Sequence, residues 1–290
     1  MDDQENIKLS IVIPTVGRTK ELDNLLESIE KAKLDFRYEI IIIDQNDKCF
    51  LDNIVNKYNG KLPIIHEIVS LKGLSRAKNQ GVKLASGQFI SFPDDDSKIL
   101  HDTYQNAFVE IENNNLDMVF GKCIDEKGVD SVLNFKKEST FLNQQNMLGG
   151  FVEATVISKI DILKKWNFDE NMGAGCFFGA EEGYDWLYRI LTEGTSLNIM
   201  FSPRIQFFHP QVILSKGDEN SLNRVFKYRC GTAYLCVKHN FKFKLKKRIW
   251  LSRIASFIYY LLDRKKASYY NVEKNALQLG KEFAKLKLNK

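Results

Sequence analysis

Three consecutive carboxylates, Asp94, Asp95 and Asp96, follow the apolar run at residues 88–93, where a buried strand would reach the edge of its sheet. Like charges this close repel unless a cation neutralises them, and a few hard carboxylate oxygens suit Mg2+ or Mn2+ bound jointly with a phosphate. In open parallel sheets, ligands bind at the carboxyl ends of the strands. The pattern therefore indicates a metal site for a nucleoside diphosphate, rather than a solvated acidic turn.

The elements that must position these carboxylates alternate along the first part of the chain. Short, continuously apolar runs predict buried strands, and apolar residues at helical spacing lie between them. Such strands are expected at residues 9–14, 39–43, 63–69, 89–93 and 117–121. Because a crossover between parallel strands lays a helix against the sheet, the fold class expected is α/β, with a doubly wound, mostly parallel sheet.

The second part of the chain is less regular. Residues 125–150 are polar and read as an irregular excursion near the active site, and a strand at 152–157 and a short helix at 160–166 follow. A glycine-dense loop at 171–180 then leads into an apolar helix stripe. Glu181, Glu182 and Asp185 lie in the first turns of that helix, where acids also complement the helix dipole.

Composition favours a cytoplasmic globular enzyme. The 290 residues are 44% hydrophobic, which supplies a core for one large α/β domain with an appendage. Five cysteines without a CxxC pair suggest neither a disulfide framework nor a zinc site. The acidic, polar start of the chain predicts no signal peptide.

Charge is unevenly distributed. Residues 241–290 hold 14 Lys and Arg against 3 Asp and Glu, a balance of +11, and the first 240 residues carry −6. This basic stretch is rich in aromatic residues, which suits peripheral contact with an anionic membrane. The alternative is a helical cap on the catalytic domain with a solvated basic face. No recognition fold accompanies the charge, so no nucleic acid is expected as a partner.

Four segments in order resemble the nucleotide-sugar half of family-two glycosyltransferases with the GT-A fold, of the bacterial surface-polysaccharide type. They are Ile11–Thr15, Ile42–Asp44, Gly73–Gly81 and Phe92–Asp96, and Gly179–Trp186 follows at a plausible distance. The resemblance covers about residues 8–210. It implies a Rossmann-like catalytic domain at 1–215, with a nucleotide-sugar part at about 8–100 and an acceptor part at about 101–215. Residues 216–290 form a helical basic extension.

The resemblance also implies roles at the nucleotide. Asp44 would accept a hydrogen bond from the nucleobase, and the Pro14–Thr15 turn would flank the nucleoside. Arg76 and Asn79 would border the nucleotide, with Arg76 offering its fork of donors to the diphosphate. The chain departs from the family after Asp44, because residues 45–47 are Gln-Asn-Asp where a second Asp, a Gly and a Ser are common. The base that is read is therefore left open.

The remaining roles concern the metal, the base and the acceptor. In the aspartate run Asp96 is the expected metal ligand, Asp94 lies nearer the ribose and Asp95 points at the sugar. His209 completes the metal shell. The catalytic base comes from Glu182, with Glu181 and Asp185 as alternatives, because an acceptor hydroxyl must lose its proton as it attacks. Aromatic rings stack on acceptor sugars. The rings expected to do so are Tyr184 and Trp186.

Together these features predict a metal-dependent, inverting glycosyltransferase at the inner face of the plasma membrane. It would use Mg2+ or Mn2+ to move a sugar from a nucleotide diphosphate sugar, UDP-linked by preference, to a hydroxyl of a glycan or lipid-linked acceptor. One alternative is a sugar-phosphate nucleotidyltransferase, although Pro14–Arg18 is a poor match for its glycine-rich loop. Another is a nucleotide-sugar-binding protein without catalysis.

Overall fold

The computed structural model describes residues 6–194, 196–211 and 218–289, which form two compact units. Within that range, the sheet unit takes in residues 6–72, 76–167 and 186–211, and the helical unit takes in 73–75, 168–185 and 218–289. The domain boundary expected at residue 215 lies outside the described residues. The helical unit includes the glycine-rich loop as well as the basic extension.

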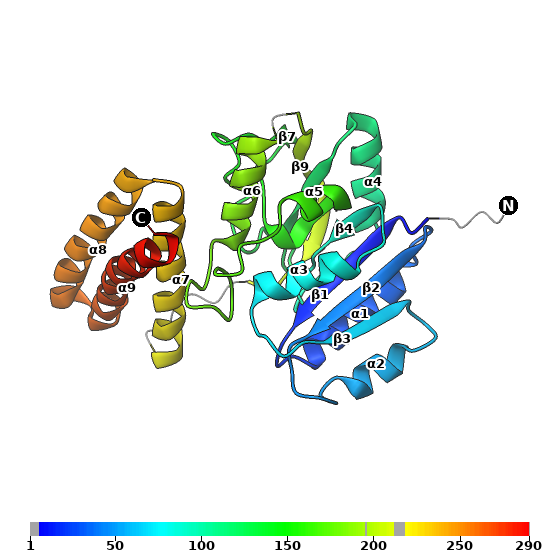
Figure 1. Cartoon of the computed structure of the whole chain (residues 1–290), viewed down its shortest axis with the longest axis horizontal. Helices are drawn as coiled ribbons and strands as arrows, with labels where there is room; N and C mark the ends of the chain where they lie inside the picture. Colours follow the sequence, from blue (N-terminus) through cyan, green and yellow to red (C-terminus); the bar gives the residue numbers. More distant parts are fainter. Residues whose placement is uncertain (1–5, 195, 212–217, 290) are drawn as a thin grey trace. The chain divides into compact units, whose positions relative to one another are not determined.

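In the described part of the chain, nine strands form one sheet in the sheet unit (Figure 1). Its order is β3-β2-β1-β4-β8-β6-β9-β5, and β7 also pairs with β9. The strands are β1 (Leu9–Thr15), β2 (Tyr38–Asp44), β3 (Ile64–Ile68), β4 (Phe89–Ser91), β5 (Lys98–Ile99), β6 (Met118–Ile124), β7 (Thr140–Phe141), β8 (Val156–Lys159) and β9 (Ile199–Phe208).

The nucleotide half of this sheet is parallel, as predicted. β1 pairs in parallel with β2 and with β4, and β2 pairs in parallel with β3. Further on the sheet is mixed, because β8 runs antiparallel between β4 and β6 while β6 and β9 are parallel. The carboxyl ends of β1, β2 and β4 therefore meet at one edge, which is where the aspartate run begins.

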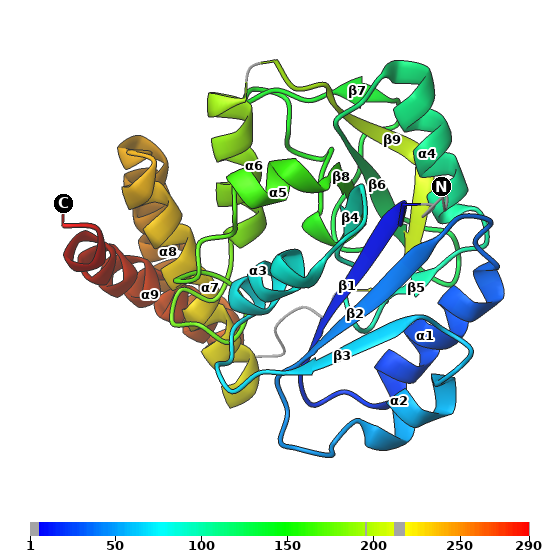
Figure 2. The ribbon, with the colours of Figure 1, turned by 45° about the vertical axis from the view of Figure 1, so that its right-hand side comes forward.

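Helices cover both faces of the sheet (Figure 2). On one face α1 (Lys20–Ala32), α2 (Asp52–Tyr58) and α4 (Thr103–Asn114) pack on a core that includes alternate residues of β1. On the other face α3 (Leu74–Leu84) approaches Val12 through Gly81, where an added Cβ would come within 2.2 Å of the Val12 Cγ1. α5 (Ile160–Lys165) and α6 (Glu182–Glu193) lie beside each other, and the indole of Trp186 donates to the Trp166 carbonyl.

Three helices form most of the helical unit, as expected for the basic extension. α7 (Glu219–Lys238), α8 (Lys242–Leu262) and α9 (Arg264–Leu288) pack together, and Gly280 of α9 lies so close to α7 that an added Cβ would meet the Cys230 Cα at 2.7 Å. The buried Glu273 of α9 links all three helices, because it forms an ion pair with Arg229 of α7 and accepts two hydrogen bonds from Arg248 of α8. Among the described helices, none is long and apolar enough to cross a bilayer.

Candidate active site

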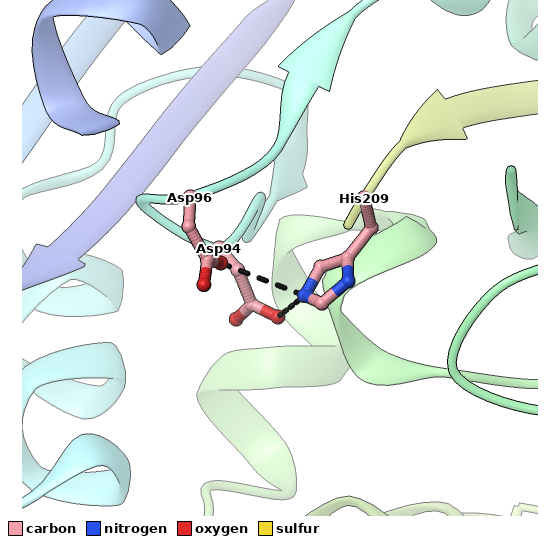
Figure 3. A group of neighbouring side chains, drawn as sticks. All are labelled: Asp94, Asp96 and His209. Carbon is pink, nitrogen blue, oxygen red and sulfur yellow. Dashed lines mark ion pairs between the residues drawn. The ribbon is translucent and has the colours of Figure 1, made fainter. Parts of the chain in front are cut away.

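Two carboxylates and one imidazole converge at the end of the aspartate run (Figure 3). Asp94 and Asp96 lie in the turn after β4, and His209 directly follows β9. The His209 Nε2 is 3.5 Å from the Asp96 Oδ1 and 3.8 Å from the Asp94 Oδ2. One potential ligand atom from each residue lies within 4.8 Å of the others. We call these three residues the triad. It contains the two residues expected as metal ligands, Asp96 and His209, and adds Asp94.

A backbone contact sets the tautomer of the triad histidine. The His209 Nδ1 lies 2.7 Å from the Pro210 carbonyl oxygen, which can only accept a hydrogen bond. Nδ1 therefore carries the proton, and in the neutral ring Nε2 presents its lone pair to the two carboxylates. A carbonyl that orients a ligating imidazole in this way is typical of metal sites.

The charges around Asp94 favour a divalent cation. Burial raises the pKa of Asp94 to about 6, while Lys78 acts to lower it and Glu153 to raise it. Lys78 is fully buried on α3, with its Nζ 3.6 Å from the Glu153 Oε1, in the 3-10 turn η1 (Glu153–Thr155). The carboxylates of the triad and Glu153 outnumber this cation, and a donor set of two carboxylates and an imidazole fits Mn2+ or Mg2+. Sequence reasoning missed both Lys78 and Glu153.

The middle aspartate is held by the turn after β1. The Thr15 Oγ1 donates to the Asp95 Oδ2 at 2.7 Å, and the Arg18 guanidinium donates to the Asp95 Oδ1 at 2.5 Å. Arg18 also pairs with the Asp96 Oδ2 at 2.7 Å. Asp95 is 8% exposed, and it holds the turn after β4 against the end of β1 in this structure. Its predicted contact with the sugar stays a prediction, and Arg18 is a site residue that the sequence pattern did not reveal.

Asp44, the residue at the end of β2 that is expected to bind the nucleobase, is held by several contacts. Asp44 is fully buried, and its carboxylate accepts from the backbone and side chain of Asn46 and contacts the His66 Nε2 at 3.0 Å. His66 comes from the neighbouring strand β3, and the sequence offered no context for it. Thr15 and Asp44 are register partners at the ends of β1 and β2, so the Pro14–Thr15 turn lies beside Asp44. Their contact with a nucleoside stays a prediction.

Two further residues expected at the nucleotide lie on α3. Asn79 is buried and Arg76 is half-buried. They share this helix with Lys78, whose charge acts on Asp94. α3 therefore brings at least one cation to the triad, and nucleotide contacts of Arg76 and Asn79 stay predictions.

The three acids proposed as catalytic base occupy different environments in the helical unit. Asp185 is fully buried, and its Oδ1 lies 2.8 Å from both the Lys238 Nζ and the His239 Nε2. Glu181 accepts from the Thr232 hydroxyl at 2.8 Å and has a left-handed backbone, with φ of 73°. The assignment of the base among them stays a prediction.

Glu182 lies against the glycine-rich loop. A Cβ added at Gly173 would come within 3.2 Å of the Glu182 Cδ and 3.0 Å of the Ser75 Oγ, and Gly173 has φ of 101°. Only glycine combines this backbone conformation with so close an approach. The loop therefore fixes where the Glu182 carboxyl lies at the start of α6.

The two aromatic residues proposed for the acceptor differ in exposure. Trp186 is fully buried, with its indole ring 6.4 Å from that of Phe120, so it packs in the core of the sheet unit. Tyr184 is only partly buried, and the Lys244 Nζ lies 5.0 Å from its ring centroid. Acceptor stacking stays a prediction for both, and only Tyr184 offers a partly accessible ring in this structure.

The mostly parallel sheet, with an acidic cluster at the carboxyl ends of its strands, has the arrangement expected for the GT-A fold. The chain belongs to glycosyl transferase family 2, because the model of that family matches residues 10–181. The matched segment holds the aspartate run, Asp44 and Glu181, and Glu182, Asp185 and His209 lie beyond it.

Named relatives agree with this family. The chain is 27% identical over 184 residues to the GalNAc(5)-diNAcBac-PP-undecaprenol beta-1,3-glucosyltransferase of Campylobacter jejuni, a match over 60% of this chain and 57% of that protein. It is 29% identical over 151 residues to the poly(ribitol-phosphate) beta-N-acetylglucosaminyltransferase TarS of Staphylococcus aureus, over 48% and 26% respectively. The chain thus spans less than two thirds of these relatives. The chain therefore belongs to a family of glycosyltransferases, and neither alternative function is favoured.

Solved structures confirm the fold. A crystal structure of S. aureus TarS 1-349 superposes with a TM-score of 0.58 at 18% identity, covering 98% of this chain and 92% of that one. The mannosyltransferase PcManGT from Pyrobaculum calidifontis, in complex with GDP-Man and Mn2+, gives 0.55 at 13% identity, with coverage of 99% and 75%. At these identities the likeness concerns the fold alone.

Proposed function

We propose that this glycosyltransferase is metal-dependent and inverting, and that it moves a sugar from a UDP-linked donor to a hydroxyl of a surface glycan or its lipid-linked precursor. The observation that carries the proposal is the triad, in which two carboxylates and an oriented imidazole face one point. A divalent cation bound there would neutralise the diphosphate as it leaves. Inversion follows if the acceptor attacks the anomeric carbon in one in-line step.

The chain's own groups supply the rest of the donor site. Thr15 and Asp44 at the ends of neighbouring strands would hold the nucleoside, and Arg76 would pair with the diphosphate. UDP is the preferred nucleotide because TarS 1-349 has been crystallised with UDP-GlcNAc. PcManGT was crystallised with GDP-Man, so the nucleobase that this chain prefers must be tested.

Glu182 is our choice of catalytic base. Asp185 is enclosed with Lys238 and His239, and Glu181 is bound by Thr232, so each already serves the packing of α7. Glu182 is also buried, at 6% exposure, and lies against the glycine-rich loop at the start of α6, where the family resemblance expects the base. A carboxylate at this point would take the proton of the acceptor hydroxyl as it attacks, a contribution of about 100-fold or more to the rate.

The acceptor proposed is a membrane-held glycan. The C. jejuni relative is named for an undecaprenol-linked acceptor. We infer a similar setting for this chain, at the inner face of the plasma membrane.

The test is donor turnover in the presence and absence of metal. The purified chain is incubated with UDP-GlcNAc, UDP-Glc, UDP-GalNAc and GDP-Man, with Mn2+, with Mg2+ or with EDTA, and release of the nucleoside diphosphate is measured. We expect release with one UDP-sugar that EDTA abolishes and added Mn2+ restores. Turnover that is unchanged in EDTA would refute the metal dependence. Turnover with GDP-Man alone would refute the choice of UDP as the donor nucleotide.

A further inference from the structure

The outward face of α8 carries a row of exposed aromatic and aliphatic side chains. Phe243, Trp250 and Phe257 recur at intervals of seven residues, and Leu261 follows one turn after Phe257. Their exposed fractions are 80%, 59%, 73% and 76%. Residues seven apart on a helix lie on nearly the same side, so these four form one stripe along α8. We call it the α8 stripe.

The opposite side of α8 makes the contacts within the helical unit. Leu245 and Ser252 are buried there, and Arg248 reaches Glu273 of α9 with two hydrogen bonds. The packing of α7, α8 and α9 therefore uses the inward side and leaves the α8 stripe in water. Large exposed side chains gathered in this way mark an interaction surface, whereas single exposed apolar residues are ordinary.

Charge selects the kind of partner. α8 contains six Lys and Arg residues and no Asp or Glu, and α9 begins with Arg264, Lys265 and Lys266. On α8 the cations lie at residues 242–253, and the more apolar part is 254–262. Pairing two copies of this chain through the stripe would bring the lysines that flank it, Lys246 and Lys247, near the cations of the other copy, which disfavours self-association. A nucleic acid duplex would match the charge through its phosphates and leave the aromatic rings in water.

We propose that the α8 stripe is a docking surface for an anionic lipid bilayer. Trp250, Phe257 and Leu261 would enter the interface, while Lys246, Lys247 and the start of α9 would meet lipid phosphates. The helix would lie in the plane of the membrane, since none of the described helices can span it. This inference goes beyond sugar transfer, because it rests on the surface of the helical unit and needs neither donor nor metal.

Vesicle co-sedimentation of the full chain tests the proposal. Vesicles of phosphatidylcholine alone are compared with vesicles that also contain phosphatidylglycerol, without any nucleotide. We expect sedimentation with the anionic vesicles and little with the neutral ones. Phe257→Asp should abolish binding, and Lys246→Gln with Lys247→Gln should weaken it roughly tenfold or more, because each lysine near an anionic surface contributes about 1 kcal/mol.

Matched controls lie in the sheet unit. Phe141→Asp makes the same change at a phenylalanine that is 54% exposed, and Lys61→Gln with Lys83→Gln removes two exposed lysines. Both controls should bind anionic vesicles as the unchanged chain does. Every variant is checked for an unchanged melting temperature, so that lost binding is not mistaken for misfolding.

Three results would overturn the proposal. One is a full chain that stays in the supernatant with anionic vesicles, and another is equal binding by Phe257→Asp and Phe141→Asp. The third is a dimer in sedimentation equilibrium that Phe257→Asp dissociates without any vesicle binding, since the stripe would then be a protein interface. None of these readouts depends on catalysis, so failure here is distinguishable from failure of the proposed sugar transfer.

Discussion

Each unit contains an acidic cluster, and the surroundings shift the pKa of a carboxyl group in one cluster upward and in the other downward. In the sheet unit, burial raises the pKa of Asp94 to about 6 even though Lys78 counteracts it. In the helical unit, burial also acts against ionisation of Asp169, yet the hydrogen bond and charge of Lys238 outweigh it and lower the pKa of that carboxyl. The first cluster carries an unfavourable negative charge, and the second is neutralised by the chain itself.

This difference distinguishes a cluster that could bind a metal from a cluster that stabilises the fold. Lys238 of α7 joins Asp169 and Asp185, so these two carboxylates are held by α7 within the helical unit. The triad instead holds like charges together at a strand edge, where a divalent cation would relieve them. The aspartate run and the acids bound by Lys238 look alike in the sequence. Only the residues that pair with them distinguish a proposed metal site from a structural ion pair.

Removing a triad carboxylate should have the largest effect. Asp96→Asn is expected to lower the rate of donor turnover on the order of a thousandfold, because the charge that develops on the leaving diphosphate loses its stabilisation. The steady-state rate of UDP release measures this. The exposed Asp35→Asn is the matched control and should retain full activity, and an active Asp96→Asn would separate the triad from catalysis.

Breaking the network of the helical unit should reduce stability. Lys238→Met leaves Asp169 and Asp185 without their shared cation, and we expect the free energy of unfolding to fall by about 3 kcal/mol. Urea denaturation measures the change. Lys285→Met removes a cation from a surface pair with Glu282, so it should leave the urea midpoint unchanged. Equal stability of both variants would contradict the structural role given to this network.

The choice of catalytic base is tested next. Glu182→Gln should lower turnover to an acceptor about 100-fold. It should leave the increase in melting temperature on addition of Mn2+ and UDP intact, because the triad is untouched. Glu181→Gln removes the charge while its amide oxygen can still accept from the Thr232 hydroxyl, so it serves as the comparison and should retain most of the activity. If Glu181→Gln is the inactive variant, the base is misassigned.

The pH dependence of metal binding should be the smallest effect. Since the pKa of Asp94 is about 6, protons compete with the metal below that pH, and affinity should fall about tenfold per pH unit there. In the metal-free protein the folded state holds this proton more tightly than the unfolded state does, so stability should fall as pH rises from about 4 to 6. Mn2+ titration by calorimetry at several pH values measures the first effect, and Asp94→Asn should remove the slope.

Much of the sheet could be predicted because its signals are local. Continuous apolar runs such as residues 9–14 and 39–43 predict buried parallel strands, and both pair as expected. The direction of β8 could not be predicted in this way, because a four-residue strand has the same composition in either direction. The assignment of residues 168–185 to the helical unit depends on contacts with α7, which composition does not encode.

By itself the sequence determined that three carboxylates lie at a strand end, that the fold is α/β and that the chain belongs to a family of glycosyltransferases. These properties depend on residue type and short-range periodicity. Only the tertiary structure decided that Asp94 joins Asp96 and His209, while Asp95 turns to Thr15 and Arg18. The physical reason is distance along the chain: His209 follows the aspartate run by more than a hundred residues, and the register of β9 in the sheet brings them together.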